Sequence, residues 1–230
     1  MTDTLTFFVD QRTHFPLVVV PGQDFALFWL PLTKVQIEYF LSETTDSQFD
    51  RAWYDARLRN NPRITPEQLT AQTLWQAFLT HISFYEARVF SQWYGKSFDL
   101  PTTHEWHLAW QTFGEIPAHP EYVQQILALP DLHPRARLLV QACENALPGY
   151  QRLRDPAERK LSHQLLLSAG ILEYVYQDTF YNRCGFCGSS LQTGRQGIPG
   201  QNTFQTFRDA GIGERRPNLG LRPILRRPKS

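Results

Sequence analysis

The stretch ISFYEARVFSQWYGKSFDLPTTHEWHLAW, residues 82–110, carries the strongest structural signals in the chain. Ser83 followed three residues later by Glu86 is a capping box, in which the hydroxyl accepts from the Glu86 amide and the carboxylate accepts from the Ser83 amide. Apolar residues then recur at helical spacing as far as Trp93, and Gly95 suits the left-handed position that follows a helix. The pattern predicts a helix that begins after Ser83 and ends before Gly95.

A second helix is expected after a short extended link. Pro101 restricts the backbone of this link, and Thr102 or Thr103 can serve as the N-cap of a helix that continues to about Phe113. Glu105 falls in the first turn, where the helix dipole favours negative charge. The two helices would present large rings to the interior, namely Trp93, Tyr94, Trp106 and Trp110.

The segment LPTTHEW at 100–106, preceded by ISFYEA at 82–87 and WYGK at 93–96, resembles the signature of the formylglycine-generating enzyme family. The resemblance implies an α+β domain with a variant of the C-type lectin fold. It extends to both ends of the chain, because FWLPLTKVQIEYF at 28–40 is similar to a strand running into the first helix, and NLGLRPI at 218–224 to a closing strand that pairs with the N-terminal one. Two amphipathic helices in an unrelated α+β domain are the alternative interpretation.

The N-terminal part of the chain begins with residues typical of β-strands and continues with a mostly polar segment. Residues 5–32 alternate short apolar runs with turn residues, which predicts an antiparallel meander of two or three strands. Thr33 and Gln36 form another capping box at the start of the first helix. The mostly polar residues 42–71 are expected to be a long surface connection, and 69–78 fits either a short helix or an extended segment.

We treat residues 1–230 as one domain with a helical insertion at about 114–169. Three stretches of this insertion have helical periodicity: 122–129, 134–147 and 156–169. The resemblance implies that most family members have an Asn-, Asp- and Gly-rich loop here, which supplies the oxygen ligands that calcium needs. Leu-rich helices lack these donors, so a calcium site is doubtful.

Two segments after the insertion resemble parts of the family pattern. GILEYVYQD at 170–178 is similar to the central strand, although Ile171 stands where the family has Asn and Tyr174 where it has Trp. YNRCGFCGSS at 181–190 occupies the place of an Arg-Gly-Gly-Ser element. The alternating pattern of the central strand is kept, whereas its polar ligand is not.

The 23 basic and 22 acidic residues give no general footprint for nucleic acid. Basic residues concentrate at 215–229, which we interpret as a solvated terminal strand, with binding of phosphate or an acidic partner as the alternative.

The sequence has no signal-peptide pattern and no membrane-spanning apolar run. Its three cysteines do not make a disulfide framework. We therefore expect a cytoplasmic protein without a membrane partner.

Cys184 and Cys187 are the candidate catalytic and metal-binding residues. The resemblance implies copper(I), which the oxygen-dependent family members bind through two cysteines, because soft thiolates select that ion. In those members the cysteines lie beyond the Arg-Gly-Gly-Ser element and further apart. A half zinc site completed by Cys143 or His163, a redox pair, or two buried thiols are the alternatives.

Other polar residues have weaker claims to chemistry. His104 and His107 share a helix face and are expected at the surface, directed away from Trp106; an iron site like that of the related sulfoxide synthases is a weak alternative. Glu86 and Glu105 are explained by capping. Ligand-binding candidates are one acid on the central strand and four polar residues in or directly before the Gly-rich segment 184–213: Glu173, Arg183, Arg195, Asn202 and Arg208.

The sequence favours a non-catalytic binding or scaffold domain that recognises a protein or another ligand through its Gly-rich C-terminal loops. A protein partner in a larger bacterial assembly is expected, and no cofactor is. The alternative is a copper- or iron-dependent oxidase that acts on a cysteine or thiol substrate. A further alternative is the variable protein of a diversity-generating retroelement, which shares the fold but would have more Asn in its last segment.

Overall fold

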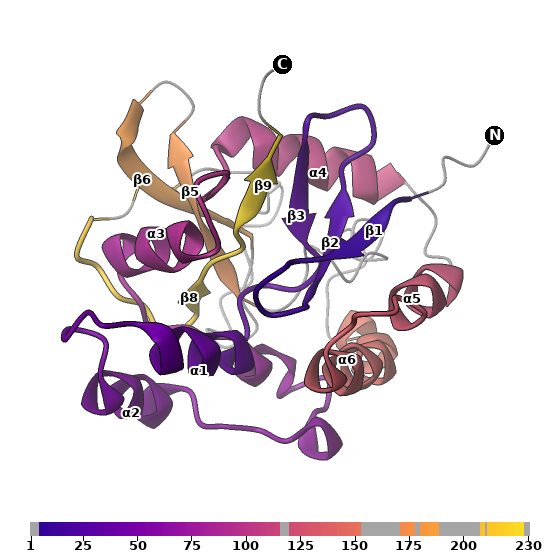
Figure 1. The fold of residues 1–230 in the computed structure, drawn as a ribbon, viewed down its shortest axis with the longest axis horizontal. Coiled ribbons are helices and arrows are strands. Elements are labelled where there is room, and N and C mark those ends of the chain that lie inside the picture. Colours follow the sequence, from indigo (N-terminus) through magenta and orange to yellow (C-terminus); the bar gives the residue numbers. More distant parts are fainter. Residues whose placement is uncertain are drawn as a thin grey trace.

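The computed structural model describes residues 5–115, 120–152, 171–177, 180–188, 208–209 and 211–227. The helices in these ranges are α1 (Lys34–Glu43), α2 (Arg51–Asn60), α3 (Phe84–Trp93), α4 (Thr103–Glu115), α5 (Pro120–Leu127) and α6 (Pro134–Arg152). The strands are β1 (Phe7–Val9), β2 (Pro16–Val19), β3 (Phe25–Phe28), β4 (Phe98–Asp99), β5 (Leu172–Gln177), β6 (Phe180–Gly188), β7 (Arg208–Asp209), β8 (Leu219–Gly220) and β9 (Ile224–Arg226). Figure 1 shows their arrangement.

A five-stranded antiparallel sheet joins both ends of the chain, in the order β1-β2-β3-β9-β4. The predicted N-terminal meander supplies β1, β2 and β3, which confirms that prediction. β9 pairs with β3 and places Leu27 opposite Ile224, as the closing strand was expected to do. On its other side β9 pairs with β4, from the link between α3 and α4.

A four-stranded sheet lies beside it, in the order β7-β6-β5-β8. β5 is the predicted central strand, and it runs antiparallel to β6 and parallel to β8. The closing segment is therefore divided, because β8 belongs to this sheet and β9 to the five-stranded one. Gly220 lies where β8 passes close to the backbone: a Cβ on it would come within 2.5 Å of the Leu79 carbonyl oxygen.

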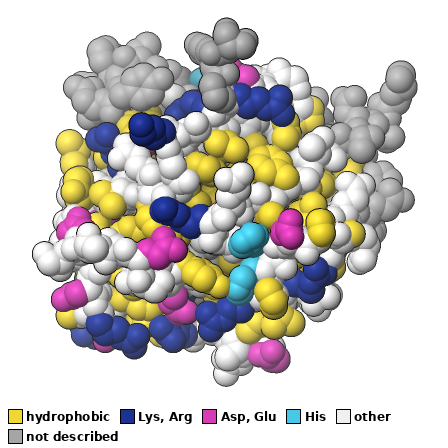
Figure 2. All heavy atoms as spheres, in the orientation of Figure 1, with side chains coloured by type: hydrophobic (Ala, Val, Ile, Leu, Met, Phe, Trp, Pro, Cys, Tyr) yellow, Lys and Arg dark blue, Asp and Glu magenta, His cyan; other side chains and the backbone are white. Residues whose placement is uncertain are grey.

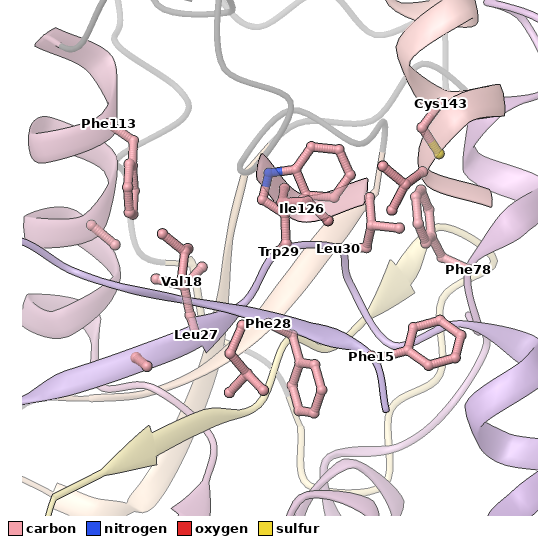
Figure 3. Packing of buried hydrophobic residues seen from close by; sticks show 14 of the residues in the cluster. Phe15, Val18, Leu27, Phe28, Trp29, Leu30, Phe78, Phe113, Ile126 and Cys143 are labelled. Atoms are coloured by element: carbon pink, nitrogen blue, oxygen red, sulfur yellow. The ribbon is translucent and has the colours of Figure 1, made fainter. Parts of the chain in front are cut away.

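The buried apolar side chains form two clusters. The first cluster lies between the five-stranded sheet and α4, α5 and α6, and Figure 3 shows its members converging from these elements, including Val18, Phe113, Ile126 and Cys143. The second cluster lies around α1 and α3. Its members include Phe40, which makes edge-to-face contacts with Phe90 and Trp93 at centroid distances of 4.9 and 5.7 Å.

β5 contributes to both clusters because successive side chains of a strand point to opposite faces. Val175, and Ile171 just before the strand, belong to the first cluster, whereas Leu172, Tyr174 and Tyr176 belong to the second. The four-stranded sheet thus forms a wall between the two clusters, with no solvated face along β5.

The capping predictions are confirmed. The Ser83 hydroxyl accepts from the Glu86 amide and the Thr33 hydroxyl from the Gln36 amide, each with the reciprocal bond of a full capping box. Gly95 has φ of +136°, as expected after the end of α3. Thr102 is the residue that caps α4, since its hydroxyl accepts from the Glu105 amide at 3.1 Å.

The polar segment 42–71 was wrongly predicted to be surface connection throughout, because it contains α2. Asp50 caps this helix by accepting from the Trp53 amide at 2.7 Å. Tyr54 and Arg57 are its buried residues, and a buried arginine does not appear in a count of apolar periodicity. The segment 69–78 contains a short 3-10 helix at Leu74–Ala77.

The helical insertion is present as far as the described residues extend. α5 and α6 correspond to its first two predicted helices, while the third, at 156–169, lies outside the described residues. α6 packs against α5 and against the 3-10 helices of the segment 66–77. None of the helices in the described ranges combines the length and apolar content that crossing a bilayer needs. Helices and two sheets in one chain confirm the α+β fold class.

Candidate functional site

Glu173, the acid on the central strand, is buried and held by an arginine from the C-terminal segment. Both side chains are 2 % exposed. Arg222 donates to Glu173 through Nη2 at 2.8 Å and through Nε at 3.1 and 3.2 Å, and its Nη1 donates to the carbonyl oxygens of Phe28 and Trp29. Trp106 Nε1 donates to the second carboxylate oxygen at 3.2 Å. Glu173 is therefore buried, as expected, and its carboxylate joins the two sheets to α4; its ligand-binding role stays a prediction.

Glu86 does more than cap α3. Besides the Ser83 amide, its carboxylate accepts from Trp53 Nε1 at 2.7 Å, from Arg57 at 2.7 Å and from Arg215 at 2.9 Å. Burial alone would raise the pKa of this carboxyl, but the hydrogen bonds from Arg215, Trp53 and Ser83 outweigh burial and lower the pKa to about 2. Glu86 is thus ionised and bound on all sides near neutral pH.

Glu105 repeats this arrangement with a third C-terminal arginine. Arg226 donates to both of its oxygens at 2.7 Å, which supports a lowered pKa of the Glu105 carboxyl against the effect of burial. The prediction that the basic tail is solvated is therefore wrong for Arg222, which is buried, whereas Arg215 and Arg226 are partly exposed and also contact acids. These arginines face acids of the folded protein, and sequence spacing could not have indicated partners more than 45 residues away.

Cys184 and Cys187 lie on β6, three residues apart, so their side chains point to opposite faces of the sheet. Cys184 is opposite Tyr176 and belongs to the second cluster, whereas Cys187 is opposite Glu173 and belongs to the first. Both are buried, at 3 % and 1 % exposure. These residues do not fit a two-thiolate copper(I) centre in this conformation, because the sheet itself separates the sulfur atoms. A ligand role for either thiol stays a prediction.

The other candidate metal ligands are also dispersed. Cys143 is buried in the first cluster, and burial raises the pKa of its thiol strongly, so that it is protonated. His104 is exposed as expected, but the ring of His107 contacts that of Trp106 at 6.0 Å, so His107 is not directed away from it. Within the described ranges no three His, Cys, Asp or Glu side chains come together as a metal site. His163 lies outside the described residues.

The remaining predicted ligand residues lie on β6, on β7 or in the segment that connects these strands. Arg183 is on β6, and Arg208 begins β7, where it pairs with Phe186. Arg195 and Asn202 lie outside the described residues. Residues 189–207 thus join two neighbouring antiparallel strands, for which a hairpin needs only about two to five residues.

Lys34 was not singled out by sequence reasoning. Its buried ammonium donates to the Asn61 side chain at 2.8 Å, to the Pro62 carbonyl at 2.6 Å and to the Gln76 carbonyl. Burial, and then the nearby Arg63 charge, lower its pKa to about 7. The Lys34 ammonium thus has three acceptors and holds the segment that follows α2 in place. Nothing in the sequence around Lys34 indicates this structural role.

The hollows on the described surface include two that lie beside α1. The larger, about 740 Å³, is lined by the β1–β2 turn, the end of α1, the α3–β4 turn and Leu225 of β9. The smaller, about 400 Å³, lies between α1 and α2 and contains Glu38, Tyr54 and Arg63. Its charges are paired with each other, because Arg63 contacts Glu38 at 2.9 Å and the Tyr54 hydroxyl donates to the same carboxylate.

The first half of the chain matches a family model. The model is described as sulfatase-modifying factor enzyme 1-like domain (FGE-sulfatase), and it matches residues 3–125. This range contains the meander, both capping boxes and the α3–α4 unit that carried the resemblance. No curated protein and no solved structure matches the chain. Because the matched range is more than half of the chain, the protein belongs to the formylglycine-generating enzyme family of sulfatase-modifying factors.

Proposed function

We propose that this protein is a non-catalytic binding domain of its family, and that residues 189–207 form its ligand surface. The observation that carries the first part is the placement of Cys184 and Cys187 on opposite faces of β6, in separate clusters. A family oxidase needs two thiolates on one ion. Bringing these two together would require β6 to leave its pairing with β5.

The state of the buried acids supports the same proposal. A general acid or base needs a carboxylate that can exchange a proton with a substrate. Glu86, Glu105 and Glu173 instead receive charged donors from Arg215, Arg226 and Arg222, in addition to their bonds to Trp53, Thr102 and Trp106. Their geometry is that of structural ion pairs.

The support for the ligand surface is its connection to a rigid frame. Residues 172–176 of β5 and 184–187 of β6 are buried, and the two strands pair over a long register. A long polar connection on such a frame is where binding residues are usually found. Arg195 and Asn202, together with four Gln residues, give this connection hydrogen-bonding groups. A protein partner in a larger bacterial assembly fits this composition best.

The first experiment tests whether the protein binds copper(I) through its two cysteines and oxidises a thiol, as a family oxidase would. The reduced protein is titrated with copper(I) against a competing chelator, beside Cys184→Ser and Cys187→Ser. We expect no tight uptake that both substitutions abolish, and no oxygen consumption with a cysteine-containing peptide. Stoichiometric copper(I) binding that needs both thiols, together with peptide-dependent oxygen consumption, would refute the proposal in favour of an oxidase.

The second experiment tests the ligand surface. The wild type is used to co-purify partners from the native host, beside a variant in which a two-residue Asn-Gly turn replaces 189–207 and a variant with Arg195→Ala and Asn202→Ala. The matched control carries Arg51→Ala and Arg59→Ala on the exposed face of α2. A partner retained by the wild type and the control but lost by both loop variants supports the surface. If the variant with the shortened loop still retains the partner, the binding surface lies outside residues 189–207.

A further inference from the structure

The larger hollow has the volume of a small-molecule site. Its volume of about 740 Å³ lies within the range of about 300–1,000 Å³ usual for ligand pockets. The pocket opens between the β1–β2 turn and the α3–β4 turn, so its walls come from opposite edges of the five-stranded sheet. On the face drawn in Figure 2, apolar side chains gather over this sheet, with Lys and Arg side chains at their margin.

The floor of the pocket is apolar and rich in rings. Phe98 is paired with Leu225, and alternation along the sheet places Phe8 on the same face. Phe8, Phe98 and Leu225 are all only half-buried. The Tyr94 ring closes the floor, at 5.3 Å from Phe98, and its hydroxyl is bound by the Gln36 side chain. A flat apolar ligand would cover these partly exposed surfaces.

Some of the charged side chains around the pocket have partners among the described residues, and others do not. Asp10 is 3 % exposed, and its two oxygens accept from the amides of Arg12, Thr13 and Phe15 and from the Thr13 hydroxyl. Glu43 lies 3.7 Å from the Arg12 guanidinium.

Arg12 is itself committed to the protein. It lies over the Trp93 ring at 4.7 Å and donates to the Trp93 carbonyl. Lys96, in contrast, is exposed on the α3–β4 turn, and no acceptor or ring among the described residues engages its ammonium. The acids that line the pocket therefore have partners within the protein, Asp10 through hydrogen bonds and Glu43 through Arg12, while the Lys96 ammonium is available to a ligand.

We infer that this pocket binds a small aromatic anion, with its ring on Phe8, Tyr94 and Phe98 and its acidic group at the Lys96 ammonium. This inference is independent of the loop surface proposed above, because none of the lining residues belongs to 189–207. It gives a binding role to Lys96 of the WYGK element, a residue that takes no part in helix capping or in core packing.

The test uses two probes that differ in one group. 8-Anilino-1-naphthalenesulfonate is an aromatic anion, and N-phenyl-1-naphthylamine is the same ring system without the sulfonate. Fluorescence titration of the full chain is expected to give one saturable site for each. The anion should bind more tightly, and its affinity should fall with added salt while that of the neutral probe does not. Failure of both probes to saturate one site would overturn the pocket as a ligand site.

Lys96→Gln removes the charge from an exposed turn, and Arg59→Gln on the exposed end of α2 is the matched control. Lys96→Gln is expected to weaken the sulfonate about three- to five-fold, as for one partly exposed ion pair, and to leave the neutral probe unchanged. Arg59→Gln should change neither. Equal loss of both probes, or none, would overturn the role of Lys96.

A steric variant locates the site. Ser97 is exposed and lines the pocket, so Ser97→Phe places a ring inside it without touching a buried residue. With the far-ultraviolet circular dichroism and melting temperature unchanged, both probes should lose at least about ten-fold in affinity. Undiminished binding in this variant would place the probes elsewhere and overturn the inference.

Discussion

Residues 82–110 and residues 211–227 show how differently two parts of one chain can be recognised in sequence. The first contains α3, β4 and α4, whose caps and apolar faces depend on residues three or four positions apart. The second contains β8 and β9 and has little regular structure of its own. Yet Arg222 lies in the interior, and Arg215 and Arg226 pair with acids of the helical region from partly exposed positions.

The two regions are joined by ion pairs, and this explains the difference. Glu86 and Glu105 each use part of the carboxylate for the local cap, and the rest accepts from Arg215 or Arg226. Arg222 makes the corresponding pair with Glu173 of β5. Each of these two carboxylates therefore makes one local hydrogen bond, which the sequence predicts, and one ion pair with a distant arginine, which it does not. If this is correct, breaking the distant ion pair should cost more than breaking the cap.

The largest effect is expected at Arg222. Arg222→Met leaves the Glu173 carboxylate buried and without its guanidinium, and loss of one partner of a buried pair costs about 3–5 kcal/mol. Urea denaturation of the variant measures this cost. The double variant with Glu173→Leu should recover part of the loss, because no charge is then left buried. A double variant as unstable as the sum of the two single ones would contradict this reasoning.

Glu86 should give the protein an acid-labile component of stability. Its folded pKa of about 2 lies below the ordinary value of 4.5, so its contribution is fully present above pH about 4.5 and is lost as the pH falls towards 2. At 1.36 kcal/mol per pKa unit the contribution is about 3 kcal/mol. Urea denaturation between pH 2.5 and pH 6, roughly the window set by the two pKa values, measures it.

The matched variants for this test are Glu86→Gln and Arg215→Ala. Glu86→Gln should have a flatter pH dependence than the wild type, because the titrating group is absent. Arg215→Ala should show a smaller change, because Arg57 still contacts the carboxylate at 2.7 Å and the Arg215 side chain is 40 % exposed. An unchanged slope in Glu86→Gln would show that other groups set the acid sensitivity.

Gly220 tests the close approach of β8 to the neighbouring backbone. A Cβ there would lie 2.5 Å from the Leu79 carbonyl oxygen and 2.8 Å from Ile171 Cδ1, and backbone does not yield easily. Gly220→Ala should therefore lower the free energy of unfolding by about 2 kcal/mol. Gly213→Ala, which would meet nothing within 4 Å, is the control and should be close to neutral. Equal stability of the two variants would mean that β8 can move away.

Much of the fold could be predicted because its signals are local. Thr33, Ser83 and Gly95 mark helix ends by their own chemistry, and alternation along 172–176 marks a buried strand. α2 was missed because its buried residues include Arg57, which a hydrophobic pattern counts as exposed. The pairing of Arg222 could not be predicted, since nothing in its neighbourhood distinguishes it from a solvated arginine.

The candidate site was less predictable than the fold. The spacing of Cys184 and Cys187 suggested a shared ion, but both residues lie on the strand β6, where an odd spacing directs two side chains to opposite faces. The pocket depends on Phe8, Lys96 and Leu225, which come together only when β1, β4 and β9 join one sheet. Residues gathered by sheet topology leave no spacing signal in the sequence.

The smallest effect is expected for a cap alone. Thr33→Ala removes the hydroxyl that accepts from the Gln36 amide at 3.3 Å but leaves Gln36 Oε1 bound to the Thr33 amide at 2.9 Å. Such a change costs about 1 kcal/mol in the free energy of unfolding, measured with urea. Thr65→Ala, at the exposed start of a short 3-10 helix, is the matched control and should cost less. Since Thr33 is fully buried, a loss for Thr33→Ala as large as that for Arg222→Met would mean that the cap is as dependent on distant packing as the arginines are, and the distinction between the two regions would fail.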